Sequence, residues 1–409
     1  MGADILDSRY AWLRLGVSLL IGMIGNIGMW VVIVVMPAVQ AEFGLERAAA
    51  SYPYTMTMMG FALGNFAIGR IVDRFGITVA LSGAAVMIGA SFAAAAISPT
   101  VLILTALHFF VGFGTAASFG PLIADVSLWF LKRRGIAVAI AASGNYLSGA
   151  IWPVLLAGVQ ATMGWRGVYM VLAVIVVGAV VPLSLFLRRR VPLEATAHSD
   201  AISGQRARSA GFKPATLAWL LGIAGIGCCM AMSMPQVHIV SFCVDLGYGP
   251  AVGSQMLSLM LLGGVVSRLI SGMLSDRLGG VKTLLIGSTL QCLALFLYLP
   301  FDGLVSLYVV SAIFGLSQGG IVPSYAVIVR EYMPAKEAGA RVGFVMMATI
   351  LGMALGGWMS GWIYDVTGSY QMAFWNGIVW NFLNIGIMLL ILTRSRPRLP
   401  RPASGTVTP

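Results

Sequence analysis

Apolar residues along this chain gather into long runs that short polar segments separate. Each run reaches the roughly 20 residues that an α-helix needs to cross a bilayer. The pattern therefore predicts an all-α membrane protein with twelve transmembrane helices. We place the spans at residues 15–39, 51–72, 78–98, 100–130, 134–162, 166–188, 216–245, 251–276, 281–300, 304–331, 337–365 and 370–393.

The composition supports a membrane protein. Apolar residues make up 59% of the chain and charged residues only 10%, whereas a soluble domain has about 25% charged residues. The first run, 15–39, is too long for the apolar part of a cleavable signal peptide, so we interpret it as a span. All four cysteines fall in apolar segments without the spacing of a metal site, which predicts a packing role and neither metal nor cofactor.

The positive charges are distributed unevenly between the loops. Only Arg47 and Arg166 fall in odd-numbered loops, and Arg268 lies within a span; the other Lys and Arg residues lie at the termini or in or beside even-numbered loops. Cytoplasmic loops of membrane proteins carry such an excess of Lys and Arg. We therefore expect a protein of the cell (inner) membrane with both termini on the cytoplasmic side. The net charge of +11 then reflects topology and anionic lipid headgroups, not a nucleic-acid partner.

This topology can be tested with a single introduced cysteine. Ser203 lies in the polar segment between the sixth and seventh spans, which we place in the cytoplasm. We expect Ser203→Cys to be unreactive toward an impermeant thiol reagent in intact cells and reactive in inverted vesicles. Labelling from outside intact cells would contradict the predicted orientation.

An internal repeat divides the chain into two halves. The segment GRIVDRFG, 69–76, recurs as GMLSDRLG, 272–279, an offset of 203 residues. Gly112 and Gly315 keep the same offset, which indicates two six-helix bundles repeated in parallel. The predicted organisation is an N-terminal bundle at 1–188, a cytoplasmic linker at 189–214, a C-terminal bundle at 215–393 and a cytoplasmic tail at 394–409.

Arg268 is a cation deep within the eighth span. It lies eight residues before Asp276, which puts it about 12 Å into a hydrocarbon core about 30 Å thick. A guanidinium at that depth has to face protein or water. No acid is found at the neighbouring helical positions, which hold Gly264, Val265, Ser271 and Gly272. Two interpretations follow: an anion-binding site, or a structural arginine satisfied by backbone carbonyls or by Asp125.

The repeated Gly-x-x-x-Asp-Arg-x-Gly segment on a duplicated six-helix plan resembles the major facilitator superfamily. The segments 124–149 and 235–247 resemble its branch of monocarboxylate transporters and oxalate–formate antiporters. The resemblance implies that an arginine on the eighth helix contacts the substrate carboxylate. Arg268 occupies that place in this chain.

Three departures from that branch limit what the resemblance implies. The antiporters carry a second cation on the eleventh helix, and here that helix has no basic residue after Arg341, which argues against a dicarboxylate. The animal-type monocarboxylate transporters carry an Asp and a Lys where this chain has Gly264 and Ala38. Proton symport therefore does not carry over directly.

The repeated segment also predicts a gate. Asp73 and Asp276 lie near helix ends, where a carboxylate caps backbone amides or pairs with arginine. We expect Arg70 and Arg74 to pair with Asp125, and the corresponding pair in the second half to act with them as a latch; the alternative is a static anchor of the helix ends. The predicted gating residues are Gly69, Arg70, Asp73, Arg74, Asp125, Gly272, Asp276, Arg277 and Glu331, with Arg277 pairing with Glu331.

Two histidines within spans are candidates for proton coupling. His238 lies beside Pro235 on the seventh helix, and the reference pKa of imidazole, about 6.5, suits it to carry a proton and contact substrate. His108 on the fourth helix is the second candidate, with hydrogen-bonded packing as the alternative.

Polar side chains on other spans face the same predicted cavity. The further substrate-binding candidates are Asn26, Asn145, Tyr146, Gln318, Tyr325, Asn376 and Trp380. Asn26 has an interhelical hydrogen bond as its alternative role. Asn376, Trp380 and Asn384 form a stripe on one face of the twelfth helix, which would equally hold helices together.

These features predict a monomeric secondary active transporter, and not an enzyme. It would move a small organic anion, chiefly a monocarboxylate, across the membrane by alternating access, with a proton as a candidate coupling ion. An exporter of amphipathic compounds is the alternative within transport. A membrane-embedded sensor or enzyme is the other alternative. The sequence argues against an enzyme, because it has no H-x-x-x-H motif and no acid next to His108 or His238.

Overall fold

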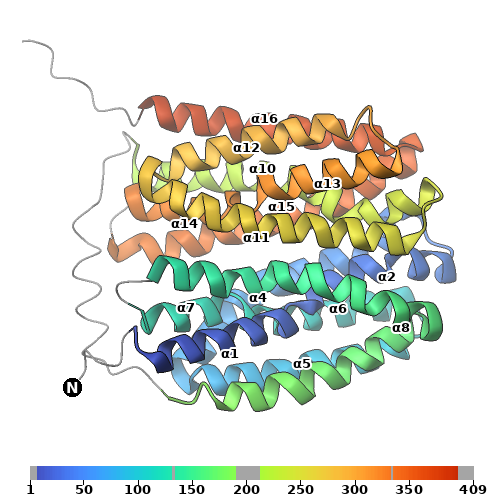
Figure 1. Ribbon diagram of the computed structural model, residues 1–409, viewed down its shortest axis with the longest axis horizontal. Coiled ribbons are helices and arrows are strands. Elements are labelled where there is room, and N and C mark those ends of the chain that lie inside the picture. The colour runs from blue at the N-terminus through green and yellow to red at the C-terminus, as the bar shows by residue number, and fades with distance from the viewer. Residues whose placement is uncertain (1–6, 131–133, 190–211, 333–334, 395–409) are drawn as a thin grey trace, which may run out of the picture.

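A computed structural model describes residues 7–130, 134–189, 212–332 and 335–394. Helices build both halves, and those of the first half lie below those of the second in Figure 1, with the described ends of the chain on one side. We call that side the terminal face and the opposite side the distal face. The predicted linker, 189–214, and the tail, 394–409, fall almost entirely outside the described residues.

The first bundle contains six membrane-spanning units. They are α1 (Arg9–Gly25) with α2 (Ile27–Phe43), α4 (Tyr52–Phe75), α5 (Ile77–Ala96), α6 (Val101–Thr115) with α7 (Gly120–Leu128), and the two parts of α8 (Arg134–Leu185). A short helix, α3 (Arg47–Ala50), lies in the first distal loop. The two parts of α8 are separated by Gly164 at the distal face. Its φ is 67°, a backbone conformation that glycine adopts more readily than other residues.

The second bundle repeats this plan. Its units are α10 (Pro214–Asp245), α11 (Pro250–Leu278), α12 (Gly280–Leu297), α13 (Leu304–Gln318) with α14 (Ile321–Tyr332), α15 (Ala335–Thr367) and α16 (Tyr370–Arg394). The twelve-span, two-bundle architecture predicted from hydrophobicity is thereby confirmed. The two bundles meet through α11 against α8, α15 against α4, and α10 against α2.

Three spans that we predicted as continuous helices are broken in the middle. The first breaks at Asn26, whose Nδ2 donates to the carbonyls of Gly22 (2.7 Å) and Ser118 (3.0 Å). The fourth span breaks between α6 and α7, at residues 116–119, and the tenth breaks between α13 and α14, at residues 319–320. These last two breaks keep the 203-residue offset, so the repeat extends to local backbone shape.

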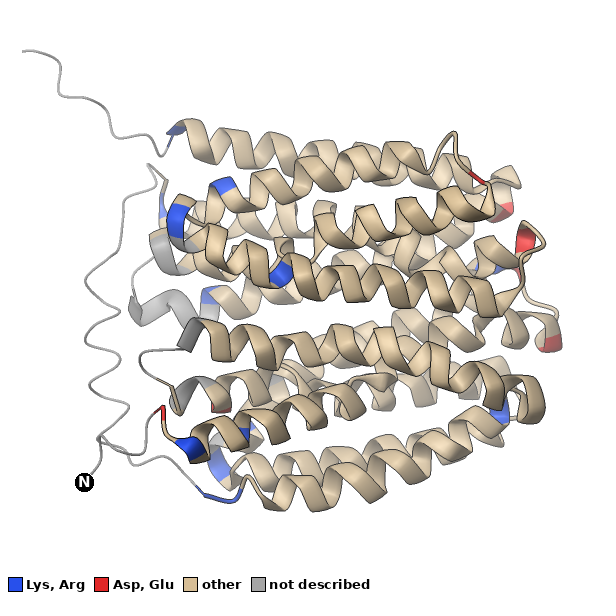
Figure 2. Cartoon of the chain, in the orientation of Figure 1, with Lys and Arg blue, Asp and Glu red and all other residues tan. Residues whose placement is uncertain are grey.

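Charge follows the two faces. Figure 2 shows most Lys and Arg residues at the terminal face, acidic residues mainly at the distal face, and one cation midway along a helix of the second bundle. This arrangement agrees with the predicted positive-inside bias.

Candidate functional site

Arg268 joins the two bundles at their interface. Its side chain projects from α11, and the residue is 6% exposed. Nη1 donates to the Ala142 carbonyl of α8 at 2.7 Å, and Nε donates to the Gly319 carbonyl at 3.4 Å. The Gly319 carbonyl is free to accept because the residue four positions on, Pro323, has no N–H. The break in the tenth span therefore supplies a partner for the guanidinium.

Tyr146 of α8 covers the cation. Its ring centroid lies 4.0 Å from the Arg268 guanidinium carbon, a cation–π contact, and its hydroxyl donates to Gln318 Oε1 at 3.1 Å. Gly264 lies one turn from Arg268 and has no side chain to occupy the space beside the cation. The Tyr146 ring fills that space, since a Cβ on Gly264 would lie 2.8 Å from it.

Within the described residues, no carboxylate contacts Arg268. We considered Asp125 as its structural partner, but Arg14 binds both oxygens of that carboxylate, at 2.7 and 3.0 Å from Nη2. The alternative based on backbone carbonyls is thus supported for some of the Arg268 donors. Carbonyl dipoles and an aromatic face carry no net negative charge, so Arg268 has no counter-ion among the described residues.

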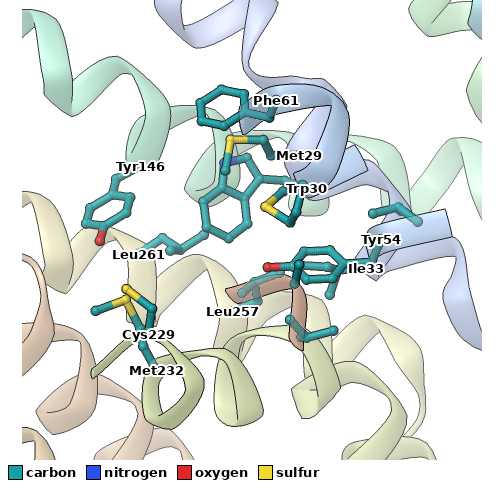
Figure 3. Close-up of a cluster of buried hydrophobic side chains, with 14 of the residues drawn as sticks. Met29, Trp30, Ile33, Tyr54, Phe61, Tyr146, Cys229, Met232, Leu257 and Leu261 are labelled. Carbon is teal, nitrogen blue, oxygen red and sulfur yellow. The ribbon is translucent and has the colours of Figure 1, made fainter. Parts of the chain in front are cut away.

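A cluster of apolar side chains extends from Arg268 toward the distal face. Figure 3 shows Met29, Trp30 and Tyr54 of the first bundle in one cluster with Cys229, Met232, Leu257 and Leu261 of the second. Leu257 and Leu261 lie about three and two turns from Arg268 on α11. The cluster therefore forms an apolar wall that begins near the cation and lies between the two bundles.

Asn26 and Asn145 are engaged in hydrogen bonds within the first bundle. The Asn145 Nδ2 donates to Asn26 Oδ1 at 3.2 Å, and the Asn145 carbonyl accepts from Trp30 Nε1 at 3.0 Å. Both asparagines are buried. Their geometry supports the interhelical role that we left open for Asn26, and it orients Trp30 at the interface.

The two histidines differ in their surroundings. His108 contacts the Leu104 carbonyl through Nδ1 (2.8 Å) and the Tyr169 hydroxyl through Nε2 (2.9 Å), both inside the first bundle. This geometry supports packing rather than proton coupling for His108. His238 contacts the Gly357 carbonyl through Nε2 (2.7 Å) and the Tyr370 hydroxyl through Nδ1 (3.1 Å).

One member of the polar stripe on the twelfth helix, Asn384, binds two neighbouring helices of the second bundle. Asn384 Nδ2 donates to Ser288 Oγ at 2.6 Å, and Asn384 Oδ1 accepts from the Tyr325 hydroxyl at 2.9 Å. These bonds support the packing alternative for Asn384, and Tyr325 takes part in the same interhelical contact. Asn376 and Trp380 are partly exposed. The contacts at Arg268 instead come from Tyr146, Ala142 and Gly319, with Gln318 bound to Tyr146.

The predicted latch at the terminal face requires a correction. Asp125 pairs with Arg14, not with Arg70 or Arg74, because α1 passes beside α7 and places Arg14 closer. The pair lies inside the first bundle, so it cannot join the two halves. The side chains of Asp73, Asp276 and Glu331 lie outside the described set, and the pairing of Arg277 with Glu331 stays a prediction. Gly69 and Gly272 each have open space where a Cβ would be.

A network at the distal face does join the two bundles. Arg47 Nη2 contacts the two carboxylate oxygens of Asp245 at 2.8 and 3.0 Å, and the backbone amides of Arg47 and Ala48 donate to Asp365 at 2.8 and 2.7 Å. Asp365 thereby satisfies the first amides of α3, which lack partners inside that helix. Burial lowers the pKa of Arg47, but Tyr370 and Asp245 raise it, and the net shift is upward.

We name Arg47, Asp245, Asp365, Tyr364 and Tyr370 the distal network. The Arg47 guanidinium carbon lies 4.9 Å from the Tyr364 ring centroid and 5.9 Å from that of Tyr370. The Tyr370 hydroxyl reaches His238. The distal network therefore connects a first-bundle loop to three helices of the second bundle and to a titratable group.

We predict that Asp365→Asn loosens the distal face. Charge-assisted bonds to two amides are stronger than those of a neutral amide, so the variant should favour opening between the bundles. Met36, buried on α2 against Ser241, provides a reporter. In a protein whose four cysteines are replaced by serine, we expect Met36→Cys to react severalfold faster with an impermeant maleimide when Asp365→Asn is added. Equal rates would show that the distal network does not control access.

Sequence reasoning missed several of these residues. Arg14 and Asp365 were not singled out, and neither were Trp30 and Tyr54. The chain has only 14 acidic residues, so each one at the end of a span is conspicuous in the sequence. A charge at that place is costly without a partner, which could have drawn attention to these residues. The identity of that partner depends on packing between distant segments.

Together, two repeated six-helix bundles, broken helices in mid-membrane and a buried cation at their interface define a multi-pass membrane protein built from two halves. The profile of the Major Facilitator Superfamily matches residues 18–253 and 219–408. The chain belongs to the Major Facilitator Superfamily, a family of transporters and not of enzymes, and the resemblance drawn from its sequence is confirmed.

Individual relatives include members of the monocarboxylate branch. The chain is 27% identical over 271 residues to monocarboxylate transporter 13 of Rattus norvegicus. That alignment covers 64% of this chain and 61% of the relative. It is 24% identical over 345 residues to the uncharacterized MFS-type transporter YcxA of Bacillus subtilis, with 81% of this chain and 82% of the relative covered. It is 23% identical over 333 residues to the agnestins efflux protein AgnL12 of Paecilomyces divaricatus, with 81% of this chain and 74% of the relative covered.

A solved structure shares the fold. It is a bacterial homologue of the human lysosomal transporter Spinster, in an inward-facing and occupied conformation, with a TM-score of 0.69. The match covers 95% of this chain and 96% of the other at 14% identity, so it bears on the fold alone.

Proposed function

We propose that this protein transports a small organic anion, chiefly a monocarboxylate, by alternating access, with Arg268 binding the carboxylate. The observation that carries the proposal is a guanidinium that is 6% exposed, lies between the bundles and meets no carboxylate among the described residues. A substrate carboxylate would supply the missing negative charge through charge-assisted hydrogen bonds. The relatives named monocarboxylate transporters support the same substrate class.

The position of Arg268 suits alternating access. Its contact with Ala142 crosses from the second bundle to the first, so a carboxylate competing for Nη1 would weaken a bond between the bundles. Binding would thereby bias the equilibrium between conformations, which requires a ligand to interact differently with each state. The sequence of the eleventh helix, which has no basic residue after Arg341, favours one carboxylate over two.

We propose His238 as the group that couples a proton. The Gly357 carbonyl accepts a hydrogen bond, so Nε2 carries the hydrogen and Nδ1 accepts from the Tyr370 hydroxyl. A proton added to Nδ1 would reverse the bond to Tyr370, whose ring faces Arg47. Arg47 and Asp365 are close enough to interact electrostatically with His238, and Tyr370 contacts it directly, so a charge on His238 would act on the distal network.

Uptake into proteoliposomes tests the proposed function. Labelled formate, acetate, pyruvate, lactate and aromatic acids would be offered with and without an inward proton gradient. We expect at least one monocarboxylate to accumulate and to exchange with its unlabelled form, whereas oxalate should not. If no carboxylate enters, or if neutral and cationic compounds compete equally well, the proposal is wrong.

Export of amphipathic anions is a second candidate. The Met, Trp and Tyr side chains between the bundles would accommodate a larger apolar body, and one relative is named an efflux protein. The two candidates differ in direction and in substrate size. Measuring flux in right-side-out and inverted vesicles separates them.

We also propose that the protein acts as a monomer in a cell membrane with both termini in the cytoplasm. The terminal face carries most of the Lys and Arg residues in Figure 2, which agrees with the positive-inside rule and with contact to anionic lipid. The labelling of Ser203→Cys tests this orientation directly.

A further inference from the structure

Two buried polar side chains near the distal end of the apolar wall lack hydrogen-bond partners among the described residues. Gln236 of α10 is 1% exposed, and neither its Nε2 nor its Oε1 has a partner there. Tyr54 of α4 is also 1% exposed, and its hydroxyl lies close to the Ser233 hydroxyl but makes no hydrogen bond of normal geometry among the described residues. Buried amides and hydroxyls are almost always hydrogen-bonded, because leaving them unpaired costs free energy. A ligand would account for both.

Gln236 follows Met232 by four residues and Cys229 by seven, which puts it on the face of α10 that carries these two members of the cluster between the bundles in Figure 3. A Cβ on Gly253 would lie 2.6 Å from the Val240 Cα, and α10 and α11 are antiparallel neighbours. Four residues before Val240, Gln236 therefore lies near Leu257, which belongs to the cluster containing Tyr54 and Trp30 in Figure 3.

Tyr54 approaches the same region from the first bundle. A Cβ on Gly357 would lie 2.9 Å from the Tyr54 ring and 3.4 Å from Ser233 Oγ, so Tyr54 and Ser233 are neighbours. Gln236 follows Ser233 by three residues, which puts both on similar sides of α10. Tyr54 and Gln236 thus lie on opposite bundles at one level of the interface.

The spacing from Arg268 sets a size for the ligand. Leu257 precedes Arg268 by eleven residues, or about 16 Å of helix. The side-chain contact between Cys243 and Met256 gives a register that differs by six residues, which places Gln236 opposite residue 263 and about 8 Å from Arg268 along the axis. The two polar ends of the interface are therefore about 8–16 Å apart, with the apolar wall between them.

We propose that Gln236 and Tyr54 form an uncharged second pole of the substrate site, selecting monocarboxylates that carry a hydroxyl or amide at the far end of an apolar or aromatic body. This inference rests on the proposed binding of the carboxylate by Arg268. Gln236 offers both a donor and an acceptor, and so does Tyr54, which matches a neutral hydroxyl or amide and gives no counter-charge to a second carboxylate. Acids of two or three carbons would engage only the Arg268 end.

The test compares 3-(4-hydroxyphenyl)propanoate with 3-phenylpropanoate, which differ by the far hydroxyl alone. Dissociation constants would be measured by ligand-induced thermal shift in detergent for the wild-type protein, Gln236→Leu and Tyr54→Phe. We expect the wild-type protein to prefer the hydroxylated acid, and each variant to lose about 2- to 10-fold in affinity for it alone. Gln291→Leu is the matched control, since Gln291 donates to the Cys228 carbonyl inside the second bundle.

Stability supplies an independent reading. Gln236→Leu removes a buried amide without partners, so its melting temperature without ligand should equal or exceed that of the wild-type protein, whereas Gln291→Leu should lower it. Tyr54→Phe keeps the ring and provides a second variant should Gln236→Leu fold poorly. If the wild-type protein shows no preference for the hydroxyl, or if both variants weaken the two acids equally, the second pole is wrong. If Arg268→Ala no longer binds either of the two phenylpropanoates, the proposed function of Arg268 is supported, whether or not Gln236 and Tyr54 form the second pole.

Discussion

Arg268→Ala and Arg268→Lys should both lose at least about tenfold in affinity for a carboxylate. The guanidinium can hold a carboxylate through two charge-assisted bonds, each worth roughly 1.5–3 kcal/mol. Lysine keeps the charge but has neither the fork nor the same reach. The measurement is the thermal shift that a carboxylate induces in detergent, with wild-type protein beside the two variants.

The matched control for this prediction is Lys282→Ala. Lys282 lies near the beginning of α12 at the terminal face, where its side chain is exposed, so the net charge changes equally while the site stays intact. Without ligand, Arg268→Ala should melt somewhat earlier than the wild-type protein because the carbonyls of Ala142 and Gly319 lose a donor. A carboxylate-dependent shift retained in Arg268→Ala would remove the anion site from Arg268.

Asp125→Ala should destabilise the first bundle by about 3–5 kcal/mol. The Arg14 side chain is 1% exposed and the Asp125 side chain 14%, with three contacts of 2.7 to 3.1 Å between them. Removing the acid leaves a buried cation whose remaining contact, among the residues that the structure describes, is the Trp129 ring, 4.7 Å away. Breaking such a pair on one side costs far more than removing both charges.

The double variant Arg14→Met with Asp125→Ala should therefore recover most of the lost stability. Thermal unfolding in detergent compares the single and double variants, and Asp302→Ala, an exposed acid in a distal loop, is the control for loss of one negative charge. If the double variant is no more stable than Asp125→Ala alone, the ion pair is not what stabilises this part of the bundle. Carboxylate affinity should be unchanged in the double variant, because Asp125 does not contact Arg268.

Sequence reasoning recovered the architecture but not the internal breaks. Hydrophobic runs revealed the twelve spans because the bilayer imposes one length and one polarity on every crossing segment. The breaks near residues 116–119 and 319–320 were not predicted, since glycine and proline are also common in intact membrane helices. The 203-residue offset held the missing signal: both breaks lie at equivalent places in the repeat.

The candidate site was predicted only in part. The sequence singled out Arg268, Tyr146 and Gln318, and the structure brings them together. Asn384 and Tyr325 are equally polar in sequence, yet they bind each other inside the second bundle. A polar residue within a span has to find a partner, but its position along the helix does not tell whether that partner is a neighbouring helix or a ligand.

The sequence by itself determined the twelve spans, the duplicated bundles and the presence of a lone cation in mid-membrane, because each follows from composition and period along the chain. Only the tertiary structure decided the partners: Arg268 with Ala142, Arg14 with Asp125, and Asp365 with the first amides of α3. Those contacts join segments that lie more than 100 residues apart. Which segments meet depends on how whole helices pack, and local hydrophobic pattern does not encode that choice.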